Sequence, residues 1–178
     1  YTVRRNNASN THQFLKSTNG GSTWIVQNVG WYTSTDANRS VVGARIAVSD
    51  ADPLKVYAFL IGDSKAGDNG FIGVYRSDNA GVSWTNTMGY DGAPYTATHP
   101  NLLNSDTSAA GFNQGFYNCA MMCSSANADE ILVGGIGMLK STDGGQTFTC
   151  IYNYGCGSYN PMHVDMQDFS AYGNEYWA

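Results

Sequence analysis

Charged side chains are scarce in this sequence of 178 residues. They make up 13% of it, against about 25% in average soluble domains. Only nine residues are Lys or Arg, the net charge is −5, and basic residues do not cluster beyond Arg4 and Arg5. This balance argues against a nucleic-acid surface or a polybasic membrane patch. No apolar run approaches the ~18 residues of a membrane-spanning helix.

Glutamate is rarer still, because Glu130 and Glu175 are the only two. Glycoside hydrolases need two facing carboxyl groups, and nothing in the sequence marks such a pair. His12 and His99 lie in polar segments without a partner pattern, so we assign them no role. The sequence indicates no cofactor and no metal site.

Glycine and tyrosine are abundant instead, with 21 and 12 residues, and Ser, Thr and Asn are scattered throughout. This composition favours strands and turns over helices. The length suits one domain and is enough to bury a core.

The four cysteines form two close pairs, Cys119 with Cys123 and Cys150 with Cys156. Neither spacing matches the usual zinc knuckle, so we favour two local disulfides in an oxidising compartment. Along one straight strand, Cys119 and Cys123 would lie ~13 Å apart, too far for a bridge. A disulfide between them therefore requires a bulge in the strand, or else each pairs with a cysteine of the other close pair. All three possible connectivities stay open.

A motif of eight residues occurs three times, and we call each copy an octet. Each opens with Ser and has Asn or Asp third, Gly fifth, Ser or Thr seventh and an aromatic residue eighth. The five fixed positions are Ser17, Asn19, Gly21, Thr23 and Trp24; Ser77, Asn79, Gly81, Ser83 and Trp84; and Ser141, Asp143, Gly145, Thr147 and Phe148. The third residue can accept backbone hydrogen bonds, and Gly supplies a positive φ. The octet therefore predicts a structural hairpin turn without chemistry of its own.

The octets begin at Ser17, Ser77 and Ser141, a period typical of large repeated units. A second match aligns residues 46–59 with 121–134, and the earlier copy carries extra residues in the loop around 62–70. Each repeat reads as four strands with the octet before the last. Four antiparallel strands at this period predict the blades of an all-β propeller.

These octets resemble the Asp-box of sialidases, sortilin-type receptors, xyloglucan-degrading enzymes and many secreted bacterial propellers. In those families the box is a peripheral hairpin, usually remote from the active site. Two boxes here carry Asn in place of Asp, which keeps the acceptor and loses the charge. The Arg-Ile-Pro motif and arginine triad of sialidases are not recognisable, which argues against that activity.

Two further segments narrow the resemblance. Residues 114–117, leading to 133–136, are similar to a blade opening in sortilin-like propellers of bacterial surface proteins. Residues 162–168, followed by 174–177, resemble the His-x-Asp-x-x-Asp strand of the same group. Proteins of that group often end in a type IX secretion sorting domain, so the resemblance also implies that secretion route. It covers most of the chain except the connection from Tyr90 to Ala110.

The repeats add up to about three blades, fewer than the 4 to 8 blades that typically close a propeller ring. We assign residues 1–30 to the end of one blade, 40–88 and 114–154 to two more, and 161–178 to the start of the next. The sequence is therefore expected to be part of a larger ring, cut at both ends.

The best polar constellation is His163, Asp165 and Asp168. His163 and Asp165 share one face of a strand, and Asp168 points to the other unless the strand bulges. They would line the channel and bind a cation or sugar hydroxyls, or supply a catalytic carboxylate. The alternative, which we favour, is that they bond neighbouring backbone. The Asp63–Gly70 loop lacks the ligand pattern of a calcium loop and reads as a solvated turn.

Aromatic residues are the other candidates, because flat rings stack on sugars. At blade spacing they more often pack between blades. They are Trp31, Tyr32, Tyr90, Tyr95, Tyr117, Tyr152 and Tyr154.

The first hypothesis is a non-catalytic segment of a secreted or cell-surface propeller, a scaffold or platform for glycans or another surface protein. Its partners would include the rest of the propeller or other copies. The second is an extracellular xyloglucanase-like glycoside hydrolase, with catalytic carboxylates outside this segment or including Asp165 or Asp168.

Overall fold

The structure, a computed structural model, describes residues 1–6, 8, 11–33, 41–63, 70–89, 101–104, 114–115, 117–152, 163, 165–172 and 175–178. In these residues every regular element is a β-strand. The strands form four antiparallel sheets, each with neighbours in chain order. No helix long and apolar enough to cross a membrane is found in the described part of the chain.

Two of the sheets have four strands, and the other two are smaller. The first sheet contains β1 (Thr2–Asn6), β2 (Thr11–Lys16) and β3 (Ile25–Val26). The second contains β4 (Val41–Val48), β5 (Val56–Gly62), β6 (Phe71–Ser77) and β7 (Thr85–Met88). The third contains β8 (Ala120–Cys123), β9 (Ile131–Gly134), β10 (Met138–Ser141) and β11 (Thr149–Tyr152). The fourth contains β12 (Ser170–Tyr172) and β13 (Glu175–Trp177).

The octets join the last two strands of the first three sheets, between β2 and β3, β6 and β7, and β10 and β11. Glycines with positive φ, among them Gly21, Gly81 and Gly145, close these turns. The central strand β5 is a continuous apolar run because both of its faces are buried, and β6 is apolar up to its last two residues, Arg76 and Ser77. The outer strand β7 keeps exposed polar residues at its start.

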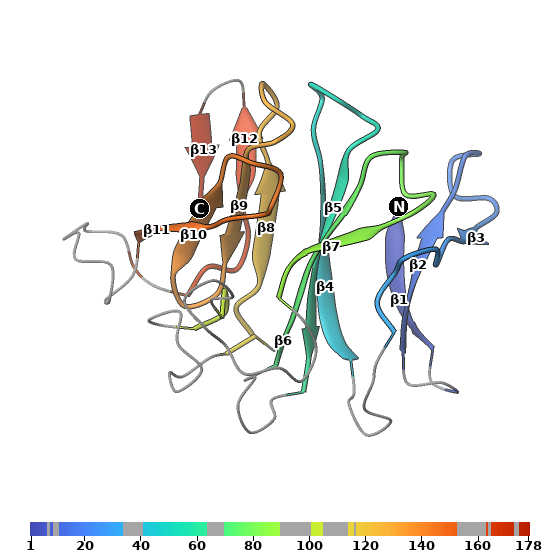
Figure 1. Ribbon diagram of the computed structural model, residues 1–178, viewed down its shortest axis with the longest axis horizontal. Coiled ribbons are helices and arrows are strands. Elements are labelled where there is room, and N and C mark those ends of the chain that lie inside the picture. Colours follow the sequence, from blue (N-terminus) through green and yellow to red (C-terminus); the bar gives the residue numbers. More distant parts are fainter. Residues whose placement is uncertain are drawn as a thin grey trace.

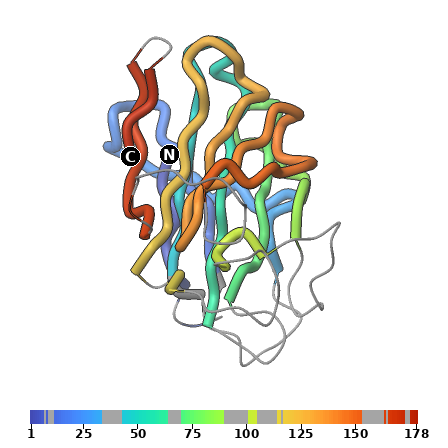
Figure 2. The backbone as a smooth tube through the Cα atoms, turned by 90° about the vertical axis from the view of Figure 1, so that its left-hand side faces the viewer, coloured from blue at the N-terminus to red at the C-terminus, as the bar shows by residue number. Residues whose placement is uncertain are grey.

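The sheets lie side by side along the long axis of the molecule, from the first sheet at the right of Figure 1 to the third and fourth at the left. Seen from the side of the fourth sheet, their strands lie one behind another (Figure 2). β4 contacts both β1 and β8, and β8 contacts β12. Consecutive four-stranded antiparallel sheets in this arrangement are the blades of part of a β-propeller, which confirms the predicted fold class.

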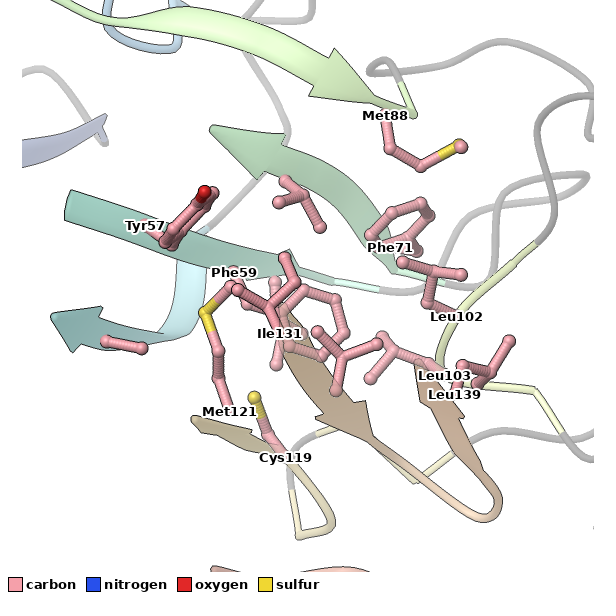
Figure 3. Close-up of a cluster of buried hydrophobic side chains, with 14 of the residues drawn as sticks. Tyr57, Phe59, Phe71, Met88, Leu102, Leu103, Cys119, Met121, Ile131 and Leu139 are labelled. Atoms are coloured by element: carbon pink, nitrogen blue, oxygen red, sulfur yellow. The ribbon is translucent and has the colours of Figure 1, made fainter. Parts of the chain in front are cut away.

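Alternate residues of β5 enter two different interfaces, as the period of a strand requires. Ala58 and Leu60 face the first sheet, in what we call the first interface, with Phe14 and Trp84. Tyr57, Phe59 and Ile61 face the third sheet, in the second interface. The second interface is filled by aliphatic, sulfur-containing and aromatic side chains (Figure 3). A third cluster joins the third and fourth sheets through Met122, Leu132, Met166 and Phe169.

The predicted disulfide between Cys119 and Cys123 is wrong. Both are free thiols, buried in the second interface. Cys119 directly precedes β8, and Cys123 ends it. All four residues of β8 pair with β9 without a bulge, so the spacing along the strand keeps the two sulfur atoms apart. Cys156 lies outside the described residues, so its pairing with Cys150 stays a prediction.

Candidate functional site

Asp165 is held in place by two contacts with the third sheet. Its carboxylate accepts a hydrogen bond of 2.6 Å from the side-chain amide of Asn118, which is fully buried. Its backbone N–H donates to the carbonyl of Ile136 at 3.1 Å. The residue adopts a φ of 78°, a left-handed conformation that is unusual for a non-glycine residue. Asp165 therefore anchors the segment that leads into β12.

Asp168 and His163 do not make these contacts. Asp168 Oδ1 accepts the backbone N–H of Phe169 at 2.9 Å, and the side chain is exposed. His163 is exposed as well. Asp168 thus bonds neighbouring backbone, whereas the carboxylate of Asp165 bonds a side chain from a distant part of the chain. In the described ranges, no group of three or more His, Cys, Asp or Glu side chains could hold a metal ion.

Each octet has the same internal hydrogen-bond network. In the first, the hydroxyl of Ser17 accepts the N–H of Gly21 at 2.8 Å and donates to Asn19 Oδ1 at 3.0 Å. Asn19 Oδ1 also accepts the N–H of Thr23 at 2.9 Å. The other two octets repeat these bonds at 2.8–2.9 Å. The network explains why Ser, Asn or Asp, and Gly stand at fixed positions.

The acidic octet differs from the two amide octets in the direction of one bond. Asn19 donates through Nδ2 to the hydroxyl of Thr23 at 2.8 Å, whereas the hydroxyl of Thr147 donates to Asp143 Oδ2 at 2.5 Å. Partial burial alone would raise the pKa of Asp143, but hydrogen bonds, chiefly from Thr147, outweigh it and hold this pKa below its ordinary value. The hydroxyl at the seventh position therefore suits either an amide or a carboxylate.

The second and third octets also dock on the preceding sheet, which sequence reasoning missed. A Cβ added at Gly81 would lie 2.5 Å from the ring of Phe14, a residue of the first sheet. A Cβ at Gly145 would lie 3.3 Å from Val74 of the second sheet. Lys16 also donates to the carbonyl of Ala80 at 2.9 Å. A signal for this docking was present, because a basic residue stands directly before the opening Ser of every octet.

The structure separates the aromatic candidates. Trp31 is only 5% exposed and packs against the rings of Phe14, Tyr75 and Trp84. Its indole N–H donates to the carbonyl of His12 at 3.2 Å. Trp31 thus leaves no face for a sugar, and its assignment as a binding residue is wrong. Tyr32 and Tyr152 are buried too, whereas Tyr117 is 58% exposed. Tyr90, Tyr95 and Tyr154 lie outside the described residues.

A small apolar pocket of about 200 Å³ lies where the fourth sheet meets the third. Exposed aromatic rings stand at its edge, because Trp177 is 60% exposed and Tyr176 is 39% exposed. The hydroxyl of Tyr176 donates to Glu130 Oε1 at 2.8 Å. Burial would raise the pKa of Glu130, but hydrogen bonds from Lys140 and Tyr176 lower it overall. The lining residues are Leu132, Met138, Lys140, Ile151, Phe169, Tyr176, Trp177 and Ala178.

A larger cleft, of about 590 Å³, opens between the first sheet and β4. His12 lines it and is only 4% exposed, yet neither ring nitrogen has a hydrogen-bond partner. Burial, and to a lesser extent the charge of Arg5, lowers the pKa of His12 to about 3. The imidazole is therefore neutral at pH 7. The sequence held no local signal for this position.

No family model matches the sequence, and no curated protein matches it. The solved structures that are similar to it include two GH74 enzymes. The GH74 enzyme of Niastella koreensis is 23% identical over 89% of this chain, with a TM-score of 0.49. The GH74 xyloglucanase from Xanthomonas campestris is 17% identical over 86% of this chain, with a TM-score of 0.49. This chain covers 20% of each of those proteins.

Proposed function

We propose that this chain is a non-catalytic part of a secreted or cell-surface β-propeller, a scaffold and a platform for glycans or another surface protein. The observation that carries the proposal is the use of the carboxylates. Asp165 bonds Asn118, Asp168 bonds backbone, and Asp143 closes an octet. Asp129 pairs with Lys55, and Glu130 with Lys140. These groups stabilise the blades and are not positioned as an acid and base around an open cleft.

The platform we propose is the edge of the fourth sheet. Tyr172 is 83% exposed, and Trp177 and Tyr176 stand beside the apolar pocket. Aromatic faces with a polar atom nearby suit the apolar face and hydroxyl groups of a sugar ring. Tyr117 and His163 remain candidates for further contacts. The octets would be Asp-boxes of a sortilin-like or xyloglucanase-like propeller, carried by type IX secretion.

Glycan binding would test the platform directly. We expect an oligosaccharide panel to include a ligand that quenches tryptophan fluorescence, and Trp177→Ala to weaken that binding at least about tenfold. Leu54→Ala is the control, because Leu54 is exposed in the turn between β4 and β5 and does not line the pocket. Equal binding by the wild type and Trp177→Ala would contradict this location.

The second candidate function is a glycoside hydrolase that recruits Asp165. The observation in its favour is the positive φ of Asp165, because strained backbone gathers at functional sites. Reducing-sugar assays on a polysaccharide panel decide between the two functions. Hydrolysis that Asp165→Asn abolishes, while thermal stability is retained, would replace the non-catalytic proposal. The non-catalytic proposal expects no hydrolysis from any variant.

The proposed extracellular location is supported by the predicted disulfide between Cys150 and Cys156. We expect thiol labelling of unfolded, unreduced protein to modify Cys119 and Cys123 alone. In the folded protein both should resist labelling, because burial raises the pKa of Cys119 to about 12 and that of Cys123 to about 11. Labelling of all four cysteines in the unfolded, unreduced protein would remove this support for an oxidising compartment.

A further inference from the structure

A histidine is buried where the first sheet packs on the second. His12 belongs to β2 and stands two residues before Phe14, so both side chains lie on the face of β2 that is turned to the second sheet. The backbone carbonyl of His12 accepts the indole N–H of Trp31, which belongs to the same interface. His12 is therefore part of the packing between two blades.

The ring of His12 is closed to water and to hydrogen bonding. Among the described residues, neither ring nitrogen has a hydrogen-bond partner, and both atoms are shielded from solvent. A neutral imidazole is tolerated there at a moderate cost, whereas an imidazolium carries two N–H donors and a full charge. The ring must therefore reach water before it can keep a proton, and it reaches water only when the two sheets move apart.

The charges around His12 do not favour a proton in the closed interface. Arg5 of β1 lies opposite His12. In the described part of the chain, the other charged side chains around the same cleft are Arg45 of β4 and Asp63, which directly follows β5, and Tyr1 adds a phenol. Two guanidinium groups thus stand against one carboxylate. Burial is the larger cause of the lowered pKa of His12, and the charge of Arg5 adds to it.

The second interface responds differently to acid. Within the described residues, its buried titratable side chains are Tyr57, Cys119 and Cys123. Burial raises the pKa of each of them above its ordinary value. These groups are neutral at pH 7 and remain neutral at pH 5. A fall in pH therefore places no new charge inside the second interface.

We propose that the first interface is a pH-sensitive contact, which opens in acid because His12 takes up a proton when the first sheet moves away from the second. The neutral ring stabilises the closed form, and the hydrated imidazolium stabilises the open form. The second and third sheets stay packed over the same pH range. Opening uncovers the aromatic surface that Phe14 and Trp84 share. The inference goes beyond the proposed function and does not depend on it.

Linkage between protonation and opening gives the expected size of the effect. The pKa of His12 is about 3 in the closed form and has its ordinary value of 6.5 once the ring is hydrated. A lowered pKa means that the closed form is favoured above pH 6.5 and loses about tenfold for each pH unit below it. The population of the open form should therefore rise about thirtyfold between pH 7.5 and pH 5.

Native-state hydrogen exchange on the full chain tests this proposal. The N–H of Trp84 donates to the carbonyl of Val29 at 2.8 Å, so its protection factor reports directly on contact between the first two sheets. Amides of β2 are a second probe, because a detached sheet whose third strand has two residues is marginally stable in water. Amides of β9, which pairs with β8 and β10, report on the third sheet.

We expect the protection factor of Trp84 to fall about thirtyfold from pH 7.5 to pH 5, and those of β9 to change less than about twofold. His12→Gln and His12→Phe both remove the titratable ring, the first with a polar and the second with an apolar side chain. Each should reduce the change at Trp84 to less than about twofold. The control Leu54→Ala, at an exposed position without a titratable group, should keep the response of the wild type.

Three results would overturn the inference. The first is a protection factor of Trp84 that does not change between the two pH values. The second is an equal loss at Trp84 and in β9, because acid would then destabilise the whole molecule. The third is a thirtyfold loss that persists in the variants of His12. The comparison of Trp84 with β9 uses the wild type, so it decides the question even where the variants do not fold. Glycan binding sensitive to Trp177→Ala tests the proposed function separately.

Discussion

The two interfaces of the second sheet are built from the same repeat but are filled differently. The first interface is aromatic, with the ring of Trp84 centred 4.6 Å from Phe14 and 4.7 Å from Trp31. It opens into the cleft beside His12. In the second interface, Leu102 and Leu103 are fully buried and belong to its core cluster.

Polar contacts close the second interface further. The hydroxyl of Tyr57 donates to the carbonyl of Ala128 at 2.7 Å, and Lys55 contacts Asp129 at 2.5 Å. Both interfaces share the docking of an octet glycine on the preceding sheet. The comparison teaches that the octet fixes how neighbouring blades pack on each other. The segments between blades determine how completely water is excluded from the interface.

Truncating a buried side chain of the second interface should have the largest effect on stability. Leu103→Ala leaves a cavity in a fully buried position and should lower the free energy of unfolding by about 3 kcal/mol. Urea denaturation measures the loss. Leu54→Ala, at an exposed position, should cost less than about 0.5 kcal/mol. Similar losses for the two variants would show that Leu103 does not seal the interface.

Octet docking should give the next largest effect. Gly81→Ala and Gly21→Ala both place a side chain at positive φ, which costs about 1 kcal/mol or more. The added methyl at residue 81 also meets the ring of Phe14, whereas at residue 21 its nearest neighbour is 3.6 Å away. We expect Gly81→Ala to be the less stable by about 2 kcal/mol in thermal unfolding. Equal losses would contradict docking on the first sheet.

The open end of the first interface should respond to acid. The pKa of His12 is lowered from 6.5 to about 3 in the folded protein, so the unfolded chain binds a proton that the folded chain does not. Stability is therefore lost as the pH falls below 6.5 towards 3. His12→Leu should remove about 1 kcal/mol of the loss between pH 7 and 5.5, measured by urea denaturation. The control Leu54→Ala, at an exposed position without a titratable group, should keep the acid-dependent loss of the wild type.

The smallest effect concerns the acidic octet. The lowered pKa of Asp143 means that its stabilisation is present above the pKa of the unfolded chain and is lost as the pH falls through the folded pKa. Asp143→Asn should remove this acid sensitivity and change stability at pH 7 by a few tenths of a kcal/mol, since an amide closes the other two octets. Thermal melts at pH 7 and pH 3 measure both. Unaltered acid sensitivity in Asp143→Asn would contradict this role.

The features that were predictable from sequence depend on local chemistry. The turn residues of the octets and the apolar runs before them indicated the sheets, because a hairpin is specified by its own residues. Trp31 was misjudged because its partner rings come from distant parts of the chain. Leu102 and Leu103 lie in the connection that the repeats do not cover. Nothing beside His12 in the sequence shows that it is buried, since its burial depends on packing between sheets.

The docking of octets gives the chain a direction. Gly81 meets the first sheet and Gly145 meets the second, so the second and third octets dock on sheets that lie earlier in the sequence. During synthesis, the surface that receives an octet has therefore already emerged from the ribosome when that octet appears. The first sheet can therefore receive the second octet, and the second sheet the third, before the rest of the chain has been made.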